Sequence, residues 1–456
     1  MLLALAGCVT LGPDYQEPAL PLPAAWSGAA AEGREDLQRW WERLGDATLT
    51  GLVVEAMRAN LDLRSAQARL REARARRDLA GAQRAPSVEA TASAGANRSS
   101  DTDTTSRLYR AGFDASWEID VFGGKRRALQ AADADLQASA ANLEATRVTL
   151  AAEVARNYVE VRGFQARLAI ARSNLASQSE TLQLTEWRAQ AGQVSSLDVE
   201  QARANREQTR AQIPTLQTSL AEAQHRLAIL LGLAPAALQE RLAAAAPVPQ
   251  APAQIAVGIP ADVLRQRPDL RAAERSLAAE TARIGQAEAA RYPSFNLTGS
   301  IGLEAASLDA LTGGATTTRA LAAGVSGPLF DGGRRRQQVE IQRAAQERSQ
   351  VSYESAVLTA LEEVENALVG FGNSGARRSA LADAVTAARN AALLARHRYT
   401  AGLVDFQTVL DTERTVLSIE DSHAASEADG VLALIQLYKA LGGGWTPQHE
   451  TSASTP

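Results

Sequence analysis

Hydrophobic and polar residues alternate along four short stretches of the chain. Between residues 107 and 121, every second residue is apolar and the residues between them are mostly polar. This period of two is typical of a β-strand with one apolar and one polar face. The same pattern, in places weaker, marks residues 86–98, 293–304 and 319–330. The alternation therefore predicts two strand hairpins, one in each half of the chain.

A longer hydrophobic period follows the first hairpin. Residues 87–213 and 329–446 contain no proline, and a proline inside a helix would interrupt it. Over residues 129–150 leucine recurs every seven positions, and after a four-residue shift the seven-residue spacing resumes over residues 154–182. Such heptads are typical of long helices that pack side by side in a coiled coil.

Two helix hairpins fit into these tracts. We predict long helices at residues 125–190 and 334–400, the second interrupted near residues 370–375, and returning helices at residues 196–231 and 406–441. With a rise of 1.5 Å per residue, the first helix would be roughly 100 Å long. A compact monomer cannot bury a rod of that length, so each long helix must lie against neighbouring helices.

The two halves of the chain repeat one another. The sequence "RAPSVEATASAGA" at residues 84–96 matches "RYPSFNLTGSIGL" at residues 291–303, and three further landmarks recur in the same order. An internal repeat of this kind indicates two structurally equivalent halves. We predict a first repeat at residues 46–233, a connector at residues 234–262, a second repeat at residues 263–443 and a flexible tail at residues 444–456.

A pair of glycines stands between strand and helix in each half. Glycine adopts backbone angles that other residues avoid, so we predict hinges where each strand pattern becomes a helix pattern. Basic clusters at residues 125–127 and 334–336 follow the glycines and are expected to face either lipid headgroups or solvent. The predicted hinges are Gly123, Gly124, Gly332 and Gly333.

The composition argues against some classes of protein and limits others. The 456 residues carry a net charge of −5, whereas nucleic-acid binding requires a basic excess or a basic face, so we expect no nucleic-acid partner. Charged residues interrupt every apolar run before the roughly 18 residues that a membrane-spanning helix needs. Passage through a membrane would therefore use strands, and because four strands cannot close by themselves, further copies of the chain would be required.

No catalytic or metal-binding motif stands out in the sequence. The four histidines are scattered and lack metal-ligand partners at useful spacing. Residues 122–127 contain Gly-Gly-Lys but lack the frame of a phosphate-binding loop, and the G-x-S-x-G elbow of hydrolases does not occur. We therefore predict no enzyme activity, no cofactor and no bound metal.

The single cysteine, Cys8, ends the apolar run "LLALAGC". A unique cysteine just after small residues resembles a bacterial lipoprotein signal, although the usual charged residues before the apolar run are missing. We predict that residues 1–7 are the remnant of a signal peptide. Residues 8–45 are then a lipidated N-terminal segment that begins at Cys8.

Two motifs carry a resemblance to a known family. "GPDY" at residues 12–15 follows the cysteine, and residues 259–302 contain the series "RPD", "AE", "IG" and "P". With the glycine hinges and two "AG" turns, the chain resembles TolC-like outer-membrane efflux factors, in the NodT-type branch of RND efflux outer-membrane lipoproteins. The resemblance implies a mainly α fold with a transmembrane β-barrel contribution. In this homotrimer, three copies of the four strands form a 12-stranded barrel, which a long α-helical barrel continues.

The resemblance also implies a function. The protein would be the outer-membrane channel component of a tripartite efflux pump in a Gram-negative bacterium, extending into the periplasm as a passive exit duct for small molecules such as drugs or toxic compounds. Its partners would be two sister copies, a periplasmic membrane-fusion adaptor, an inner-membrane RND-type pump and outer-membrane lipid.

The resemblance further implies two sets of functional residues at the ends of the helix hairpins. Three copies of one aspartate would form a ring of like charge, which a nearby arginine could neutralise to hold a gate closed. The predicted gate residues are Arg398, Tyr399, Asp405, Gln407, Asp411 and Arg414. The predicted adaptor-contact tips are Gly192, Val194, Ser195, Gly402, Leu403 and Val404.

Two alternatives stay open at this point. The same architecture serves as a type I secretion duct for proteins, although lipidation and the "RPD" motif favour small-molecule efflux. A coiled-coil structural protein without a pore would also explain the heptads. Membrane fractionation separates this second alternative, because a scaffold stays soluble whereas a duct requires detergent.

Overall fold

A computed structural model describes residues 10–27, 37–99, 103–252 and 260–445. Cys8, the predicted lipidation site, lies outside these residues. The chain divides into two compact units, which we describe separately. The first comprises Met1–Leu20, Ala68–Ala141 and Leu270–Ala356, and the second comprises Pro21–Gln67, Asn142–Asp269 and Val357–Pro456.

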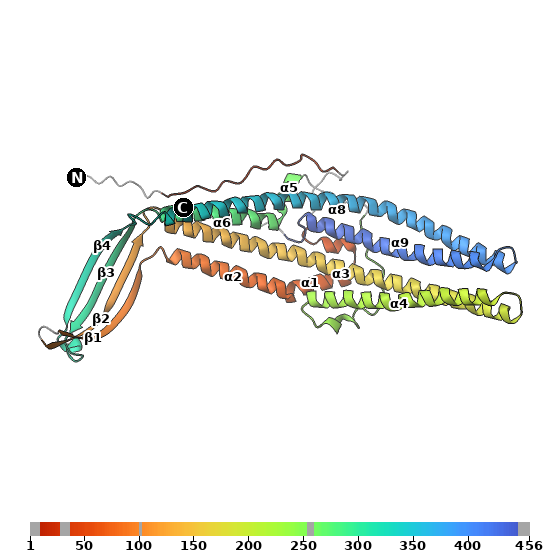
Figure 1. Ribbon diagram of the computed structural model, residues 1–456, viewed down its shortest axis with the longest axis horizontal. Coiled ribbons are helices and arrows are strands. Elements are labelled where there is room, and N and C mark those ends of the chain that lie inside the picture. The colour runs from red at the N-terminus through yellow and green to blue at the C-terminus, as the bar shows by residue number, and fades with distance from the viewer. Residues whose placement is uncertain (1–9, 28–36, 100–102, 253–259, 446–456) are drawn as a thin grey trace. The chain divides into compact units, whose positions relative to one another are not determined.

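The first unit contains a four-stranded antiparallel sheet with the order β1-β2-β3-β4 (Figure 1). A short helix, α7 (Ala310–Gly313), lies in the connection between the third and fourth strands. The predicted four strands are therefore confirmed, and the fourth begins three residues before its predicted start. The strands are β1 (Ser87–Ser99), β2 (Thr104–Ile119), β3 (Ser294–Ala305) and β4 (Thr316–Ser326).

The register places most of the large apolar side chains on the same face of the sheet. Ile119 lies opposite Phe295, which in turn lies opposite Val325. Phe113 lies between Ala90 and Ile301 on the same face, and 58% of its surface is exposed. Side chains alternate along a strand, so the other face carries the polar residues. A large apolar sheet face thus stands uncovered in a single chain.

The polar face of the sheet is held by cross-strand contacts. Thr91 donates a hydrogen bond to Asp114 at 2.8 Å, and Arg110 forms an ion pair with Glu304 at 2.8 Å. A hollow of about 410 Å³ lies on this face and is lined by serine, threonine, alanine and acidic residues of all four strands. The two faces therefore differ in chemistry as the alternating sequence predicted.

Long helices form most of the rest of the described chain. Two hairpins, α3–α4 and α8–α9, match the predicted pairs of long and returning helices (Figure 1). None of the helices in the described residues is both long and apolar enough to cross a membrane. The helices are α1 (Ala47–Ala59), α2 (Leu61–Ala82), α3 (Gly124–Gln190), α4 (Ser196–Leu230), α5 (Pro260–Gln266), α6 (Pro268–Ala289), α8 (Arg334–Thr400) and α9 (Phe406–Ala440), with short 3-10 turns η1 (Trp40–Leu44) and η2 (Pro235–Leu238).

The predicted interruption of the second long helix near residues 370–375 is wrong. Helix α8 is continuous through its three glycines there, although each glycine costs a helix about 1 kcal/mol relative to alanine. Helix α8 contacts α9 at this level. Arg377 forms an ion pair with Asp429 at 2.9 Å, and Gly430 of α9 lies against Ser374.

A compact core lies in the second unit, where η1 packs against the C-terminal end of α9. Trp40 is fully buried and stacks on Tyr438 with ring centroids 5.1 Å apart. Arg162 of α3 donates hydrogen bonds to the Tyr158 hydroxyl at 3.1 Å and to the Ala244 carbonyl at 2.8 Å. Because Ala244 belongs to the predicted connector, these bonds attach the connector to α3.

Candidate functional site

Both helix hairpins end in turns of the same construction. Gly192 and Gly402 adopt φ angles of +71° and +72°, in the left-handed region that favours glycine. The amide of Gln193 donates to the Arg188 carbonyl at 2.9 Å, and the amide of Leu403 donates to the Arg398 carbonyl at 2.9 Å. This is the Schellman pattern, which satisfies the last carbonyl groups of a helix. Gly192 and Gly402 therefore end α3 and α8.

The returning helices begin with side-chain caps. Ser195 and Asp198 form a reciprocal capping box at the start of α4. Asp405 accepts hydrogen bonds from the Thr408 amide at 2.9 Å and the Thr408 hydroxyl at 2.6 Å. These two bonds lower the pKa of Asp405 below its usual value. Asp405, predicted as a gate residue, is thus the N-cap of α9.

The predicted adaptor-contact residues lie at the ends of both hairpins. Gly192, Ser195, Gly402 and Leu403 are exposed, and Val194 and Val404 are half-buried. Space is open around both glycine Cα atoms. The tips therefore present accessible backbone together with an exposed leucine.

An apolar cluster joins the two hairpins just behind the tips. Phe406 of α9 packs there, and its ring lies 5.3 Å from that of Tyr399. The Arg188 guanidinium of α3 lies over the Tyr399 ring at 5.0 Å, within the range of a cation–π contact. The cluster consists of Leu182, Ala202, Ala395, Phe406, Val409 and Leu410. Tyr399, a predicted gate residue, thus connects α8 to α3.

Three of the predicted gate residues lie close together on α9. Gln407 donates a hydrogen bond to Asp411 at 2.8 Å, and the Arg414 guanidinium lies 3.7 Å from the same carboxylate. Arg414 also donates to the amide oxygen of Asn205 on α4 at 2.9 Å. Asn205 is buried and was missed in the sequence, because nothing local marks it. Arg398 is exposed at the end of α8.

A polar ladder runs along α3 beside the predicted leucine seam. Four α3 residues spaced by seven contact the α8–α9 hairpin. The first three stand immediately before a leucine of the seam, and the fourth follows seven residues later. The four contacts are Arg167–Asp421 at 2.7 Å, Asn174–Glu420 at 2.9 Å, Thr181–Glu413 at 2.8 Å and Arg188 over Tyr399 at 5.0 Å. The seven-residue spacing of these polar residues is visible in the sequence and is the signal that marks them as contacts of one helix face.

Helix α8 contributes a second set of contacts to the ladder. Arg389 forms an ion pair with Glu420 at 2.7 Å, and Arg396 forms one with Glu413 at 2.7 Å. The two arginines are seven residues apart, as are the two glutamates. Glu413 is only 5% exposed, so removing its arginine would leave a buried charge unpaired.

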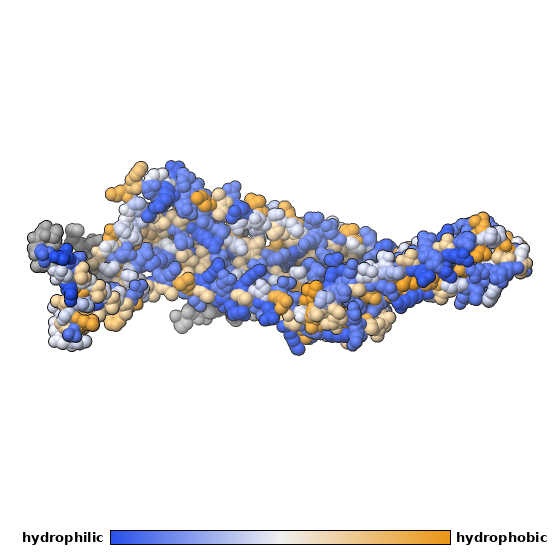
Figure 2. Space-filling model, turned by 60° about the horizontal axis from the view of Figure 1, so that its bottom comes forward, coloured by the Kyte–Doolittle hydropathy of each residue, from blue (hydrophilic) through white to orange (hydrophobic). Residues whose placement is uncertain are grey.

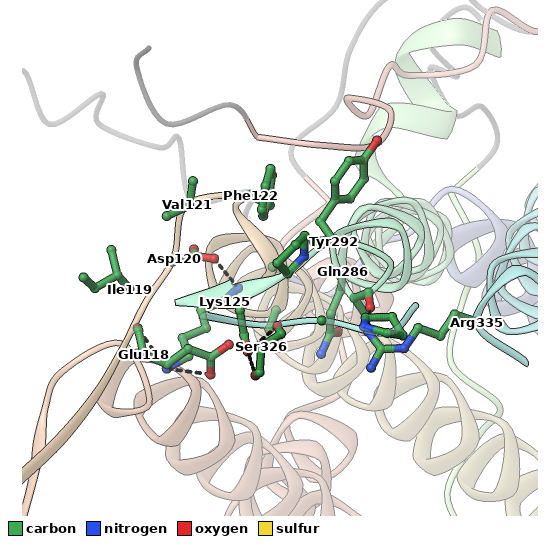
Figure 3. A pocket seen from close by; sticks show the side chains of 18 of the residues that line it. Glu118, Ile119, Asp120, Val121, Phe122, Lys125, Gln286, Tyr292, Ser326 and Arg335 are labelled. Atoms are coloured by element: carbon green, nitrogen blue, oxygen red, sulfur yellow. Dashed lines mark hydrogen bonds and ion pairs between the residues drawn. The ribbon is translucent and has the colours of Figure 1, made fainter. Parts of the chain in front are cut away.

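The junctions between strand and helix contain the predicted hinges, and Figure 3 shows side chains at the first junction, among them Asp120, Phe122 and Tyr292. Gly123 has a φ of +77°, and Gly332 and Gly333 have φ angles of +62° and +86°. Gly124 is already the first residue of α3. A cavity of about 650 Å³ lies at the first junction, where Phe122 packs on Tyr292 with ring centroids 4.7 Å apart.

An aspartate caps the helix at each junction. Asp120 accepts hydrogen bonds from the amides of Lys125 and Arg126 at 3.1 and 2.8 Å. Asp331 accepts from the amides of Gly333 and Arg335 at 2.9 and 3.2 Å, and these bonds lower its pKa. Aspartate is a preferred helix cap, so both could have been read from the sequence beside the glycines.

The first basic cluster binds the N-terminal segment of the chain. Arg127 is only 4% exposed, so it faces neither lipid nor solvent. It donates hydrogen bonds to the carbonyl groups of Leu11 and Gly12 at 2.9 and 3.0 Å and pairs with Asp14 at 2.9 Å. Arg126 donates to the Thr10 hydroxyl at 2.9 Å. The prediction that the basic clusters face lipid headgroups or solvent is therefore wrong for Arg127.

The family-like motifs meet the same segment. A Cβ atom on Gly285 would come within 2.7 Å of the Leu11 carbonyl oxygen, so the glycine of "IG" gives the segment room. Glu274 of "AE" accepts a hydrogen bond from Tyr15 of "GPDY" at 2.9 Å. Burial of the Tyr15 hydroxyl, and then this bond, raise the pKa of Tyr15. The two motifs that carry the resemblance thus contact one another.

The "RPD" motif holds three helices together in the second unit. Arg267 is buried and pairs with Asp269 of α6 and with Glu363 of α8, each at 2.7 Å. It also donates a hydrogen bond to the Ala440 carbonyl at the end of α9 at 3.0 Å. Pro268 between them is the first residue of α6, a position that suits proline.

Known proteins resemble the chain over nearly its whole length. The sequence profile described as outer membrane efflux protein matches residues 52–233 and 259–443, one segment in each predicted repeat. Nodulation protein T of Rhizobium leguminosarum bv. trifolii is 33% identical over 451 residues, which are 98% of this chain and 96% of that protein. The pyoverdine export outer membrane protein OpmQ of Pseudomonas putida is 33% identical over 462 residues, covering 98% and 97%. The solved outer-membrane channel OprN matches with a TM-score of 0.90 and 38% identity over 96% of this chain and 99% of that chain.

Proposed function

The chain belongs to the outer membrane efflux protein family, and from that premise we propose that it is the exit duct of a tripartite efflux pump. It is an outer-membrane efflux channel component of a Gram-negative bacterium and extends into the periplasm. The duct is passive and carries small molecules outward. It has no catalytic step of its own, and energy comes from a partner in the inner membrane.

The uncovered apolar face of the four-stranded sheet is the observation that carries the proposal. Four large apolar side chains on this face are each about half exposed or more: Val88, Phe113, Ile301 and Leu321. Soluble monomeric proteins rarely expose an apolar patch of this kind. In an outer membrane this face contacts lipid, while the polar face lines a water-filled interior. A duct of this kind explains both faces at once.

Closure of the duct requires copies of the chain. Four strands leave two open edges, which cannot stand in lipid, and three copies supply the strands of a closed 12-stranded barrel. Hydrophobic side chains are exposed among hydrophilic ones on the surface (Figure 2). Several exposed hydrophobic residues lie along α8. These residues are Ile341, Val351, Leu358, Val369, Leu393 and Leu394. In a homotrimer they pack against a neighbouring copy.

The helix tips are the proposed contact with a periplasmic membrane-fusion adaptor, which links the duct to an RND-type pump. Gly192 and Gly402 leave the backbone accessible there, and Leu403 is 73% exposed. The set Gly192, Val194, Ser195, Gly402, Leu403 and Val404 is small and partly apolar, as a docking surface for a helix hairpin requires.

The α9 residues behind the tips are the proposed gate. Arg414 connects Asp411 of α9 to Asn205 of α4, so one arginine joins the two hairpins. In a trimer, three copies of Asp411 surround the axis, and their mutual repulsion opposes closure unless it is neutralised. The Arg414 guanidinium supplies that neutralisation. Arg398, Tyr399, Asp405 and Gln407 complete the gate.

Lipidation of Cys8 is the proposed anchor of the N-terminal segment. Arg127 and Gly285 hold residues 10–15 beside the strand–helix junction, a position at the predicted membrane edge. Replacing Cys8 with serine abolishes labelling by radioactive palmitate if this proposal holds. Continued labelling of that variant contradicts it.

The function is tested by export from cells and by conductance of the purified protein. Deleting the gene raises the intracellular level of a fluorescent pump substrate, and the wild-type gene restores export. Purified protein inserted in planar bilayers gives discrete conductance steps. Recovery of the protein in the soluble fraction favours the coiled-coil scaffold. If the deletion strain loses secretion of a protein substrate while its small-molecule export is unchanged, the type I secretion duct is favoured.

A further inference from the structure

Two successive rungs of the polar ladder are built alike. At the rung nearer the tip, Glu413 accepts hydrogen bonds from Thr181 of α3 and from Arg396 of α8. At the next rung, Glu420 accepts from Asn174 of α3 and from Arg389 of α8. Each rung therefore joins all three helices through one α9 carboxylate. The seven-residue spacing on every helix places the two rungs two helical turns apart.

A cavity with mixed polar and apolar walls lies between these two rungs. It has a volume of about 250 Å³ and is lined by residues of α3, α8 and α9, among them Asn174, Gln178, Arg389, Arg396 and Glu413. This space is large enough for several water molecules. Its walls combine guanidinium, carboxylate and carboxamide groups, which offer hydrogen-bond partners to water, with the apolar side chains of Ala392, Leu393 and Val416.

Gln178 lines this cavity and lacks hydrogen bonds to the described protein. Its side chain is 2% exposed, and neither its amide oxygen nor its amide nitrogen has a partner among the described residues. The second oxygen of Glu413, Oε2, is in the same situation. Buried polar groups without partners destabilise the arrangement that buries them, and solvent entering the joint relieves this.

The layer on the tip side of the cavity is apolar. There, Leu182, Phe406 and Leu410 belong to the cluster that joins the hairpins. In the other direction, the contact between α3 and α9 stays polar, because Arg167 pairs with Asp421 at 2.7 Å. The cavity therefore lies at the tip end of the polar ladder, directly behind the apolar cluster.

We propose that Gln178 and Glu413 form a hydrated joint at which the α8–α9 hairpin separates from α3 when the tips open. Glu413 is the positioning residue that keeps the hairpin closed, through Arg396 and Thr181. Gln178 keeps the joint wet, so that this level of the wall opens before the apolar cluster behind the tips does. The inference rests on the proposed function, and it names a regulatory element distinct from the predicted gate residues on the axis.

The joint is tested with two substitutions that act in opposite directions. Gln178→Leu replaces the unpartnered amide with an apolar side chain of similar volume, so hydrogen exchange of α9 residues 413–420 slows about fivefold or more. Open events of single channels become rarer by a similar factor. Glu413→Gln retains the shape but removes the charge that Arg396 binds, so exchange and open events both increase. The matched control is Gln183→Leu, an exposed glutamine on the same helix, which changes neither.

The measurements use the full-length protein in detergent and in planar bilayers. Unchanged or faster exchange in Gln178→Leu overturns the joint, as does an equal rate of opening in Glu413→Gln and wild type. A Gln178→Leu variant that is only more stable, with unchanged opening, assigns Gln178 to packing and also overturns the proposal. Absence of conductance in the wild-type protein contradicts the proposed function instead, and the two failures are thereby separate.

Discussion

Arg127 offers a direct test of how the N-terminal segment is held. Replacing it with methionine keeps an unbranched side chain of similar length but removes the guanidinium. Three contacts with the N-terminal segment are lost, to the Leu11 carbonyl, the Gly12 carbonyl and the Asp14 carboxylate. The segment then remains attached through Arg126, Tyr15 and the fit of Gly12 against Gly285.

The size of the effect follows from the burial of each partner. A hydrogen bond from a charged donor contributes about 1.5–3 kcal/mol, whereas the Asp14 side chain is 87% exposed, so its ion pair contributes about 0–1 kcal/mol. Contacts that share one side chain do not add fully. We therefore expect Arg127→Met to weaken docking of the segment by about 2–4 kcal/mol.

Hydrogen exchange measured by mass spectrometry reports this docking. The Leu11 amide donates to the Phe122 carbonyl at 3.3 Å, so its exchange requires the segment to leave the junction. A loss of about 2–4 kcal/mol accelerates that exchange about 30- to 1,000-fold. Arg126→Met is the matched control, because Arg126 donates only one hydrogen bond to the segment, to the Thr10 hydroxyl. We expect this substitution to accelerate exchange of the Leu11 amide by less than about tenfold. Equal exchange in Arg127→Met and wild type would refute the reasoning.

Three further predictions concern the tips. The pKa of Asp405 is lowered from 3.8 by its bonds to Thr408, so its cap stabilises the start of α9 above about pH 4, and this stabilisation is lost as pH falls through the lowered value. Asp405→Asn removes this pH dependence of hydrogen exchange at the start of α9. If the variant still loses protection from exchange at acid pH as the wild type does, the cap is not its cause. Gly402→Ala costs about 1–2 kcal/mol, because only the positive φ is strained and no atom lies near the added methyl group; a much larger drop in thermal stability would reveal an unseen clash. Asp411→Ala removes the carboxylate that Gln407 and Arg414 contact, so single-channel conductance rises, and an unchanged conductance excludes Asp411 from the gate.

The sequence alone determined the elements and their order. Strand and helix periods are local properties, because two residues per strand repeat and 3.6 per helical turn follow from backbone geometry. The alternation around residues 107–121, the heptads from Leu129 to Leu182 and the glycine turns are therefore readable without a structure. The repeat of these signals in both halves also indicated the duplicated architecture, and the uncovered sheet face already required other copies.

Only the tertiary structure decided which polar residues meet. Thr181 and Glu413 are 232 positions apart in the chain, and neither has a local feature that marks it as a partner of the other. Arg127 looked like part of a basic cluster that faces lipid headgroups or solvent, and residues 370–375 looked like a break, because the sequence does not show what packs against them. A contact between distant segments depends on how whole helices are aligned, and that alignment is set by the sum of all their side chains rather than by any single motif.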